Sequence, residues 1–242
     1  MRTKQFFLFL ISLAFLFIGC DRKRDLGDDA PEPLQMHIPD NDALDELSAE
    51  NRGDFKWMNP PSRFDFDNGE VTVVAEKETD FFNNPEDGKK TATAHYLYQD
   101  ISGDFVSSAL VRPDFSSQWN AISLMVHIDN DHWIKFAFEN SDATGKSIVT
   151  VVTKELSDDA NGVILEQHNA VWLKIAKRDN IYSMLWSADG KEYKMARLTT
   201  LPEADSVKIG VEFQCPVGNK AEHLLEYFKI EQKTVTELRK GV

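Results

Sequence analysis

The stretch ISLMVHIDNDHWIKFAFE, residues 122–139, decides the fold of this chain. Apolar residues take alternate positions on both sides of Asp129-Asn130-Asp131, a run with the composition of a tight turn. A period of two residues is typical of a β-strand that turns one face to a core. We therefore predict a β-hairpin whose two apolar rows, within 122–128 and 134–138, face the same core.

The other face of this hairpin carries a candidate binding site, made of His127, Trp133, Lys135 and Glu139, with Trp119 just before the first strand. An indole can cover the apolar face of a sugar ring, and polar groups can bind the sugar hydroxyls. We therefore predict a carbohydrate-binding surface here. The pattern leaves one alternative open, in which Lys135 and Glu139 neutralise each other on a solvated sheet and Trp133 covers the core edge.

The remaining chain repeats the signature of short strands separated by turns, among which Asp189-Gly190 is the strongest hairpin signal. We predict strands over 71–75, 94–99, 102–112, 148–153, 172–177, 181–187, 193–198, 206–214 and 224–231. So many strands favour two sheets that bury each other's apolar faces, which is an all-β sandwich or jelly roll. Residues 79–90 are predicted as a long loop and 154–159 as a polar excursion, and only 42–47 and 234–240 have a helical pattern.

The N-terminus has the pattern of a targeting segment. Arg2 and Lys4 precede an apolar run over 6–18, which is shorter than the about 20 residues that a membrane span requires. The following Gly19-Cys20 resembles the bacterial lipoprotein box, whose cysteine is acylated and becomes the mature N-terminus. We predict a signal peptide over 1–19 and lipidation of Cys20. The alternatives are an uncleaved anchor or an ordinary secretory signal.

Domain organisation follows from a shift in composition along the chain. Residues 20–54 are rich in Asp, Glu and Pro and poor in aromatics, so we predict an acidic flexible tether. The sandwich domain is predicted over 55–232, starting at the Phe55–Pro61 segment, and a C-terminal tail over 233–242.

Charge and cysteine usage limit the partners. The formal net charge of −13 argues against nucleic acid, whose phosphates would be repelled. With Cys20 acylated, Cys215 has no partner for an intramolecular disulfide, and we expect it to be a small buried side chain. No phosphate-binding glycine loop and no metal-ligand spacing of histidines is present, so we predict no cofactor and no metal. The turn at Asp65–Glu70 resembles a calcium loop, but any tight turn selects the same residue types.

The sequence resembles a family of bacterial and fungal proteins, the regulation of enolase proteins, which have concanavalin A-like domains. The resemblance rests on motifs that follow one another from Phe55 to Glu231. These motifs are Trp57–Pro61, Thr79–Phe82, Leu124–Asp129, Trp133–Lys135, Glu139, Val151–Thr153, Ser157-Asp158 and Ser187-x-Asp189-Gly190.

The resemblance implies a concanavalin A-like jelly roll in a carbohydrate-linked setting, and it adds Thr153 and Asp158 to the candidate site. It implies no known reaction. Two motifs depart from the family pattern. Family members commonly have Tyr-Asp-Gln-Ala-Gly where this chain has Trp119–Ser123, and a tryptophan where this chain has Asp159.

Three functions fit these observations. The first is a lipid-anchored module of the bacterial cell envelope, on the periplasmic face or the outer membrane, that binds carbohydrate without catalysis. The second is a glycoside hydrolase or an accessory domain of glycan degradation, which requires paired carboxyl groups, with Glu139 beside Asp158 or Asp80. The third is a non-catalytic scaffold for an envelope protein partner.

Overall fold

The structure, a computed structural model, describes residues 36–48 and 50–242. The predicted signal peptide, Cys20 and the first part of the predicted tether lie outside these residues. Within the described part, no helix is long and apolar enough to cross a membrane.

The predicted central hairpin is confirmed. Strand β8 (Ala121–Asp129) pairs antiparallel with β9 (His132–Ser141), and Ile122 lies opposite Phe138. The two apolar rows point into one core, where Leu124 and Phe136 are fully buried. Alternation of side chains along each strand puts His127, Trp133, Lys135 and Glu139 on the opposite face, as the pattern indicated.

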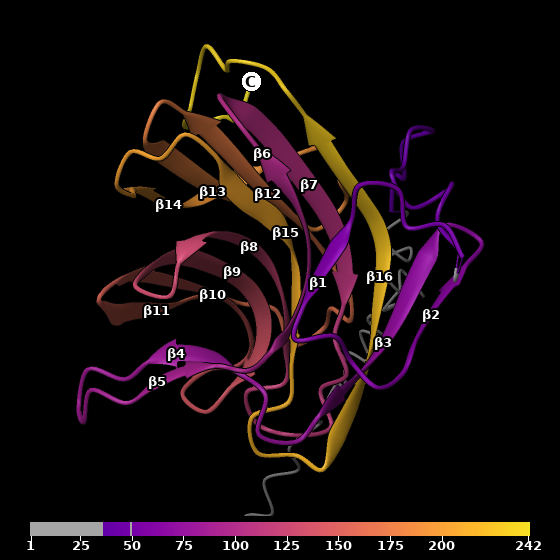
Figure 1. The fold of residues 1–242 in the computed structure, drawn as a ribbon, viewed down its shortest axis with the longest axis vertical. Coiled ribbons are helices and arrows are strands. Elements are labelled where there is room, and N and C mark those ends of the chain that lie inside the picture. Colours follow the sequence, from indigo (N-terminus) through magenta and orange to yellow (C-terminus); the bar gives the residue numbers. More distant parts are fainter. Residues whose placement is uncertain (1–35, 49) are drawn as a thin grey trace, which may run out of the picture. The chain divides into compact units, whose positions relative to one another are not determined.

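The hairpin forms the middle of a seven-stranded antiparallel sheet, here called the first sheet, with the order β1-β6-β15-β8-β9-β10-β11 (Figure 1). Its other strands are β1 (Lys56–Met58), β6 (His95–Ile101), β10 (Gly145–Lys154), β11 (Leu156–Ile164) and β15 (Val207–Gln214). Strand β11 occupies the segment predicted as a polar excursion. That prediction is wrong because an edge strand with both faces near solvent keeps polar side chains and shows no apolar period.

The second sheet also has seven antiparallel strands, in the order β14-β13-β12-β7-β16-β3-β2. These strands are β2 (Phe64–Asp67), β3 (Glu70–Glu76), β7 (Phe105–Arg112), β12 (Val171–Arg178), β13 (Ile181–Ser187), β14 (Lys194–Thr200) and β16 (Lys220–Glu231). Leu173 and Phe228 from this sheet meet Phe136 and Val211 from the first sheet in the main core. The predicted all-β sandwich is confirmed. Apolar side chains at alternate positions of the inner strands form the two sheet faces that pack against each other.

Residues 79–90, predicted as a long loop, form a short hairpin of β4 (Phe81–Asn83) and β5 (Lys90–Ala92). The hairpin lies against the outer face of the first sheet, inside the curve of β8, β9 and β10 (Figure 1). Phe81 and Ala94 pack there on Tyr96 and Met125, which makes a second, smaller core outside the sandwich. Sequence periodicity missed this hairpin because its strands have three residues each.

The described part of the predicted tether, 36–48 and 50–54, packs against the second sheet. Strand β3 pairs with β16 only as far as Leu225, so the backbone of Phe228 is open on that side. The carboxylate of Asp42 accepts a hydrogen bond from Phe228 N at 2.9 Å, and Ala43 N donates to Phe228 O at 2.8 Å. Leu44 is 1% exposed and belongs to the main core. This part of the tether prediction is corrected, since it completes an open strand edge.

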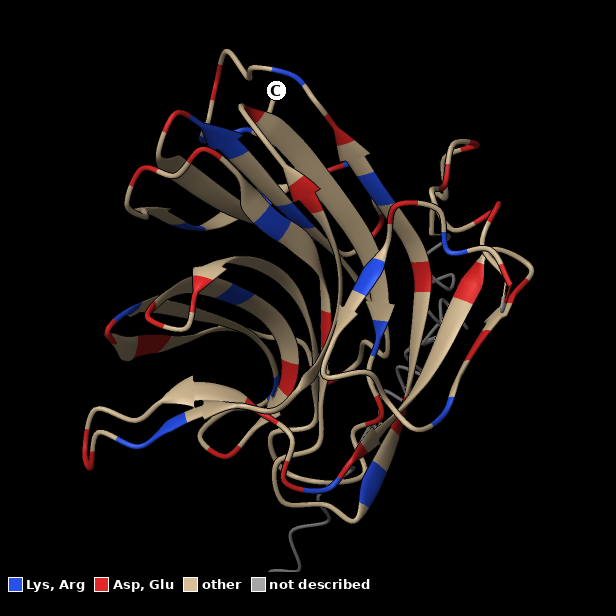
Figure 2. Cartoon of the chain, viewed as in Figure 1, with Lys and Arg blue, Asp and Glu red and all other residues tan. Residues whose placement is uncertain are grey.

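The C-terminal residues 233–242, predicted as a tail, also contact the second sheet. Val235 and Leu238 are buried against Val106 and Ala176 on its outer face. The segments 42–47 and 234–240, which have a helical pattern, contain turns and no helix. Charged residues are frequent in the loops and also on the inner strand β16, whereas most of β8 and β10 is uncharged (Figure 2).

The turn at Asp65–Glu70 is the tight connection of the hairpin between β2 and β3. Asn68 and Gly69 both have positive φ, 51° and 79°, which is the conformation a two-residue hairpin turn requires. The Asp, Asn and Gly residues of the turn therefore have a structural explanation.

Candidate functional site

The outer face of the first sheet is a grid of side chains set by strand register. Trp133 lies beside His127 on β8 and Thr153 on β10, and Lys135 lies beside Met125 and Val151. Glu139 lies further along β9, beside Ala121 and Ser147. The candidate residues therefore form a strip along one face, with Trp133 near one end and Glu139 near the other.

Strand β4 covers the Trp133 end of this strip. The Phe81 ring lies edge-on to Trp133 and to His127, each with a centroid distance of 6.1 Å. Asn83 N donates to Ser157 Oγ at 2.9 Å, and Ser157 Oγ is 2.8 Å from Thr153 Oγ1. The side chain of Asn83 fixes the hairpin further, because its Nδ2 donates to two backbone carbonyls at 2.8 and 3.0 Å.

Three candidate residues are consequently sealed from solvent. Trp133 is 1% exposed, His127 4% and Thr153 0%. The expectation that Trp133 stacks on a sugar needs correction, because the indole is a contact surface for Phe81 instead. Burial lowers the pKa of His127, so this imidazole is neutral under its cover.

The Glu139 end of the strip opens into a cleft of about 520 Å³. It lies between β4 with its following loop on one side and the ends of β9, β10 and β11 on the other. Trp119, Lys135 and Glu139 from the predicted site line it together. Asp80, Gln214 and Asp159 also line it.

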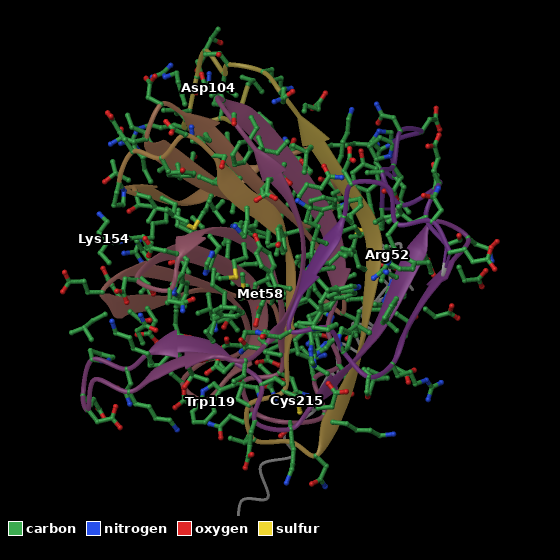
Figure 3. The ribbon with its side chains drawn as sticks, viewed as in Figure 1. Arg52, Met58, Asp104, Trp119, Lys154 and Cys215 are labelled. Atoms are coloured by element: carbon green, nitrogen blue, oxygen red, sulfur yellow. The ribbon has the colours of Figure 1, made fainter. Side chains whose placement is uncertain are left out.

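Trp119 supplies the exposed aromatic surface of the cleft and is 36% exposed. Figure 3 shows it next to the β4–β5 hairpin. Its φ is +61°, which is rare for a bulky residue and requires support from the surroundings. Trp119 N donates to Asn140 O and Gln214 Nε2 donates to Trp119 O, both at 2.7 Å. Two strands of the sheet thus hold the backbone that aims this indole.

Lys135 lines the cleft, and all three hydrogen-bond donors of its ammonium group have acceptors within the protein. Its Nζ donates to Asp80 Oδ1 at 3.0 Å, to Phe81 O at 2.8 Å and to Gln214 Oε1 at 2.8 Å. Burial alone would lower the pKa of Lys135, but the carboxyl groups around it, Asp80 foremost, raise the pKa above its usual value. Lys135 is therefore charged, and it joins β9 to the start of β4 and to the end of β15.

Glu139 faces the cleft without a partner. It is 7% exposed, and its carboxyl makes no hydrogen bond or ion pair with any residue of 36–48 and 50–242. Burial raises the pKa of Glu139 to about 8, against the opposing effect of the Lys135 charge, and Asp80, Glu212 and Asp159 raise it further. At neutral pH this carboxyl is protonated and can donate a hydrogen bond into the cleft.

A second carboxyl, Glu212 on β15, was missed from the sequence. It is fully buried beside Ser123, and both of its oxygens lack hydrogen-bond partners among the described residues. Burial raises the pKa of Glu212 to about 7, and the charge of Lys135 opposes this rise. Alternation in 207–214 indicates the outward face for Glu212 and Gln214, but no local signal shows that this strand lies next to β8.

Asp158 lies outside the cleft. It pairs in register with Val152, whose side chain is in the main core, and its Oδ2 binds Arg197 Nη2 of the second sheet at 2.8 Å. Its neighbour Asp159, opposite Val151, lines the cleft together with Asn161 of the same strand. The prediction that Asp158 belongs to the site is therefore wrong. Consecutive residues of a strand point to opposite faces, so Asp159 faces the cleft and Asp158 does not.

Other chemistry in the described residues is limited. No group of three or more His, Cys, Asp or Glu side chains among them is arranged to hold a metal ion. Cys215, which directly follows β15 and is labelled in Figure 3, is buried with a free thiol, as its sequence context indicated. The groups that the cleft offers to a ligand are the indole of Trp119, the protonated carboxyl of Glu139 and the other acidic side chains that line it.

Comparisons with known proteins give a family and a fold. The model of a family described as "Protein of unknown function (DUF1349)" matches residues 57–233. Regulation of enolase protein 1 of Saccharomyces cerevisiae is 26% identical over 154 residues, which cover 64% of this chain and 77% of that protein.

Two solved structures have the same sandwich. A functionally unknown protein from Saccharomyces cerevisiae matches with a TM-score of 0.69 at 22% identity, over 75% of this chain and 98% of that one. The xylan beta-1,4-xylosidase of Bacillus halodurans matches with a TM-score of 0.64 at 14% identity, over 84% of this chain. The match covers 41% of the xylosidase, so this chain is similar to a part of that enzyme.

Proposed function

Since the chain belongs to the DUF1349 family of proteins of unknown function, we propose a function from its own cleft, which is the binding of carbohydrate without catalysis. The observation that carries this proposal is the placement of Trp119. Its indole is exposed at the mouth of a cleft that also presents Glu139 and the carboxylate of Asp159. An apolar platform beside fixed polar groups is the combination that sugar rings require.

The fold supports this proposal indirectly. A xylan-degrading enzyme contains the same sandwich over 41% of its length. Because identity to this chain is 14%, the likeness concerns the fold, and the site has to be tested on this chain itself.

The proposal is tested by measuring binding of the purified protein to an array of oligosaccharides, followed by titration of any glycan that binds. We expect Trp119→Ala to weaken binding by about 1–3 kcal/mol, because the exposed ring loses its stacking contact. Leu198→Ala is the matched control, since Leu198 is 38% exposed and lies on β14 of the second sheet. Absence of binding across the array, or equal binding by both variants, would refute the proposed site.

Hydrolysis of the bound glycan is a second candidate function, favoured by one observation. A general acid must be protonated at neutral pH, and burial raises the pKa of Glu139 in the cleft to about 8. Any glycan that binds should therefore be incubated with the protein and assayed for new reducing ends. Loss of that release in Glu139→Gln would support hydrolysis, and unchanged release would remove Glu139 from the chemistry.

We propose further that the protein is held in the bacterial cell envelope by a lipid on Cys20. Support comes from the sequence alone, in the short basic start, the apolar run and the Gly19-Cys20 pair. A lipid anchor would keep the cleft close to the membrane, on the periplasmic face or at the outer membrane.

A further inference from the structure

The cleft has an excess of negative charge. Of the residues that line it, five have carboxyl groups and one has an ammonium group, and these residues are Asp80, Glu86, Glu139, Asp142, Asp159 and Lys135. The only cation in this set, Lys135, is 2% exposed and already has three hydrogen-bond acceptors. A ligand in the cleft therefore meets carboxyl groups without meeting an available positive charge.

Glu139 adds an independent indication of a ligand. Its side chain is more than nine-tenths buried, it faces the cleft, and its carboxyl has no partner among the described residues. A buried polar group without a partner is unfavourable unless something outside the chain completes it. The partner of this carboxyl, water or a ligand, enters through the cleft, because the sheet lies on the other side.

We propose that the cleft binds a glycan that carries a protonated amine, such as an oligomer of glucosamine, with its ammonium at Glu139 and with Asp159 among the other acidic residues that line the same cleft. This inference rests on the proposed carbohydrate binding and names the class of sugar. An ammonium has three donors, and carboxylate oxygens are its strongest acceptors. Trp119 at the mouth favours the same ligand, since an indole attracts both a sugar ring and a nearby cation.

The surroundings of Glu139 explain why the charge of the ligand matters. Around this carboxyl lie Lys135 on its own strand, Asp80 before β4, Glu212 on β15 and Asp159 on β11. Burial and the three acidic neighbours favour the protonated form of Glu139 in the free protein, whereas the Lys135 charge opposes it. An ammonium beside Glu139 favours its ionised form. At a pH below the pKa of the sugar amine, where the ligand is already an ammonium and Glu139 is still protonated, binding should then release the Glu139 proton to the buffer.

Titration calorimetry of the full chain tests the inference with oligomers of equal length made of glucosamine, N-acetylglucosamine, glucose and galacturonic acid. We expect glucosamine oligomers to bind at least about tenfold more tightly than N-acetylglucosamine oligomers, and galacturonic acid oligomers to bind most weakly. The heat of glucosamine binding should change with the ionisation enthalpy of the buffer, because a proton is released. Affinity should also fall as salt is added.

Two variants connect this preference to the cleft. Glu139→Gln and Asp159→Asn should each reduce the advantage of glucosamine over glucose oligomers, and Glu139→Gln should abolish proton release. Asp65→Asn is the matched control, since Asp65 is an exposed acid on β2 of the second sheet.

The outcomes separate this inference from the proposed function. Tight binding of glucose oligomers without preference for glucosamine overturns the inference and leaves carbohydrate binding intact. Absence of binding by all four sugars overturns both. Binding of an oligolysine peptide as tightly as the glucosamine oligomer would overturn the assignment to a sugar.

Discussion

Glu139 shows how the environment of one side chain decides its chemistry. A glutamate on a solvated strand is ionised at neutral pH, and the alternation of residues 132–141 gives no reason to expect otherwise. Here burial raises the pKa of Glu139 to about 8, the charge of Lys135 opposes this rise, and the neighbouring carboxyl groups add to it. Glu139 can therefore donate a hydrogen bond to a neutral sugar, and it can lose its proton and become an anion when a cationic sugar binds.

The first prediction concerns the stability of Glu139→Gln as a function of pH. The folded pKa of Glu139 is raised from 4.5 to about 8, so the folded state holds a proton that the unfolded state releases over this range. Glu139 therefore makes the free energy of unfolding fall as pH rises from 4.5 to about 8. Glutamine cannot ionise, so the variant should be more stable than the wild type at pH 8, by at most about 5 kcal/mol.

Urea unfolding at both ends of this pH range measures the effect. Glu70→Gln on β3 is the control, because Glu70 is exposed, and its pH profile should match that of the wild type. Parallel profiles for Glu139→Gln and the wild type would show that Glu139 ionises normally in the folded protein.

At the scale of elements, the β4–β5 hairpin decides which part of the outer face can bind. Phe81 is fully buried and packs on Trp133, Tyr96 and His127, so the hairpin converts one half of the face into a small core. Its Asn83 contacts and the Lys135 bonds to Asp80 and Phe81 fix the hairpin at both ends. The other half remains open and becomes the cleft.

The second prediction is that Phe81→Ala loosens this cover. Loss of a fully buried phenylalanine should lower the free energy of unfolding by about 3–5 kcal/mol, because a cavity opens against Trp133. The fraction of tryptophan fluorescence quenched by acrylamide should rise as Trp133 becomes accessible. Phe82→Ala is the control, since Phe82 is only half-buried, and its effect should be smaller on both measures. Equal effects of the two variants would mean that Phe81 does not anchor the hairpin.

At the scale of the whole molecule, the described chain before residue 55 is bound to the sandwich from His37, whose N donates to Asp189 O at 3.0 Å, to Asp42 and Leu44. The length available to a tether is thereby shortened. Residues 20–36 can span at most about 55 Å even when fully extended, because each residue adds no more than about 3.5 Å. A protein anchored at Cys20 would therefore work near the membrane surface.

The third prediction tests this anchor. When the protein is expressed in a bacterium, Cys20→Ser should abolish incorporation of an alkyne-labelled fatty acid and move the protein from the membrane fraction to the soluble fraction. The only other cysteine, Cys215, is buried, so Cys215→Ser is a control that should keep the label. Retention of label in Cys20→Ser would exclude lipidation at this position.

Local sequence determined the central hairpin and the faces of its strands, but not the short strands β4 and β5 or the polar edge strand β11. Alternation in 122–139 fixed the central hairpin, and it placed Trp133, Lys135 and Glu139 on one face correctly, because side-chain direction on a strand follows from the chain itself. Only the tertiary structure decided exposure and partners. Whether Phe81 covers Trp133, whether Glu212 lies beside Lys135, and whether Asp159 or Asp158 meets the cleft depend on strand register and on packing between segments far apart in sequence. Periodicity contains no information about those contacts, so a strip of four candidates on one face became a buried half and an open half only when the chain was folded.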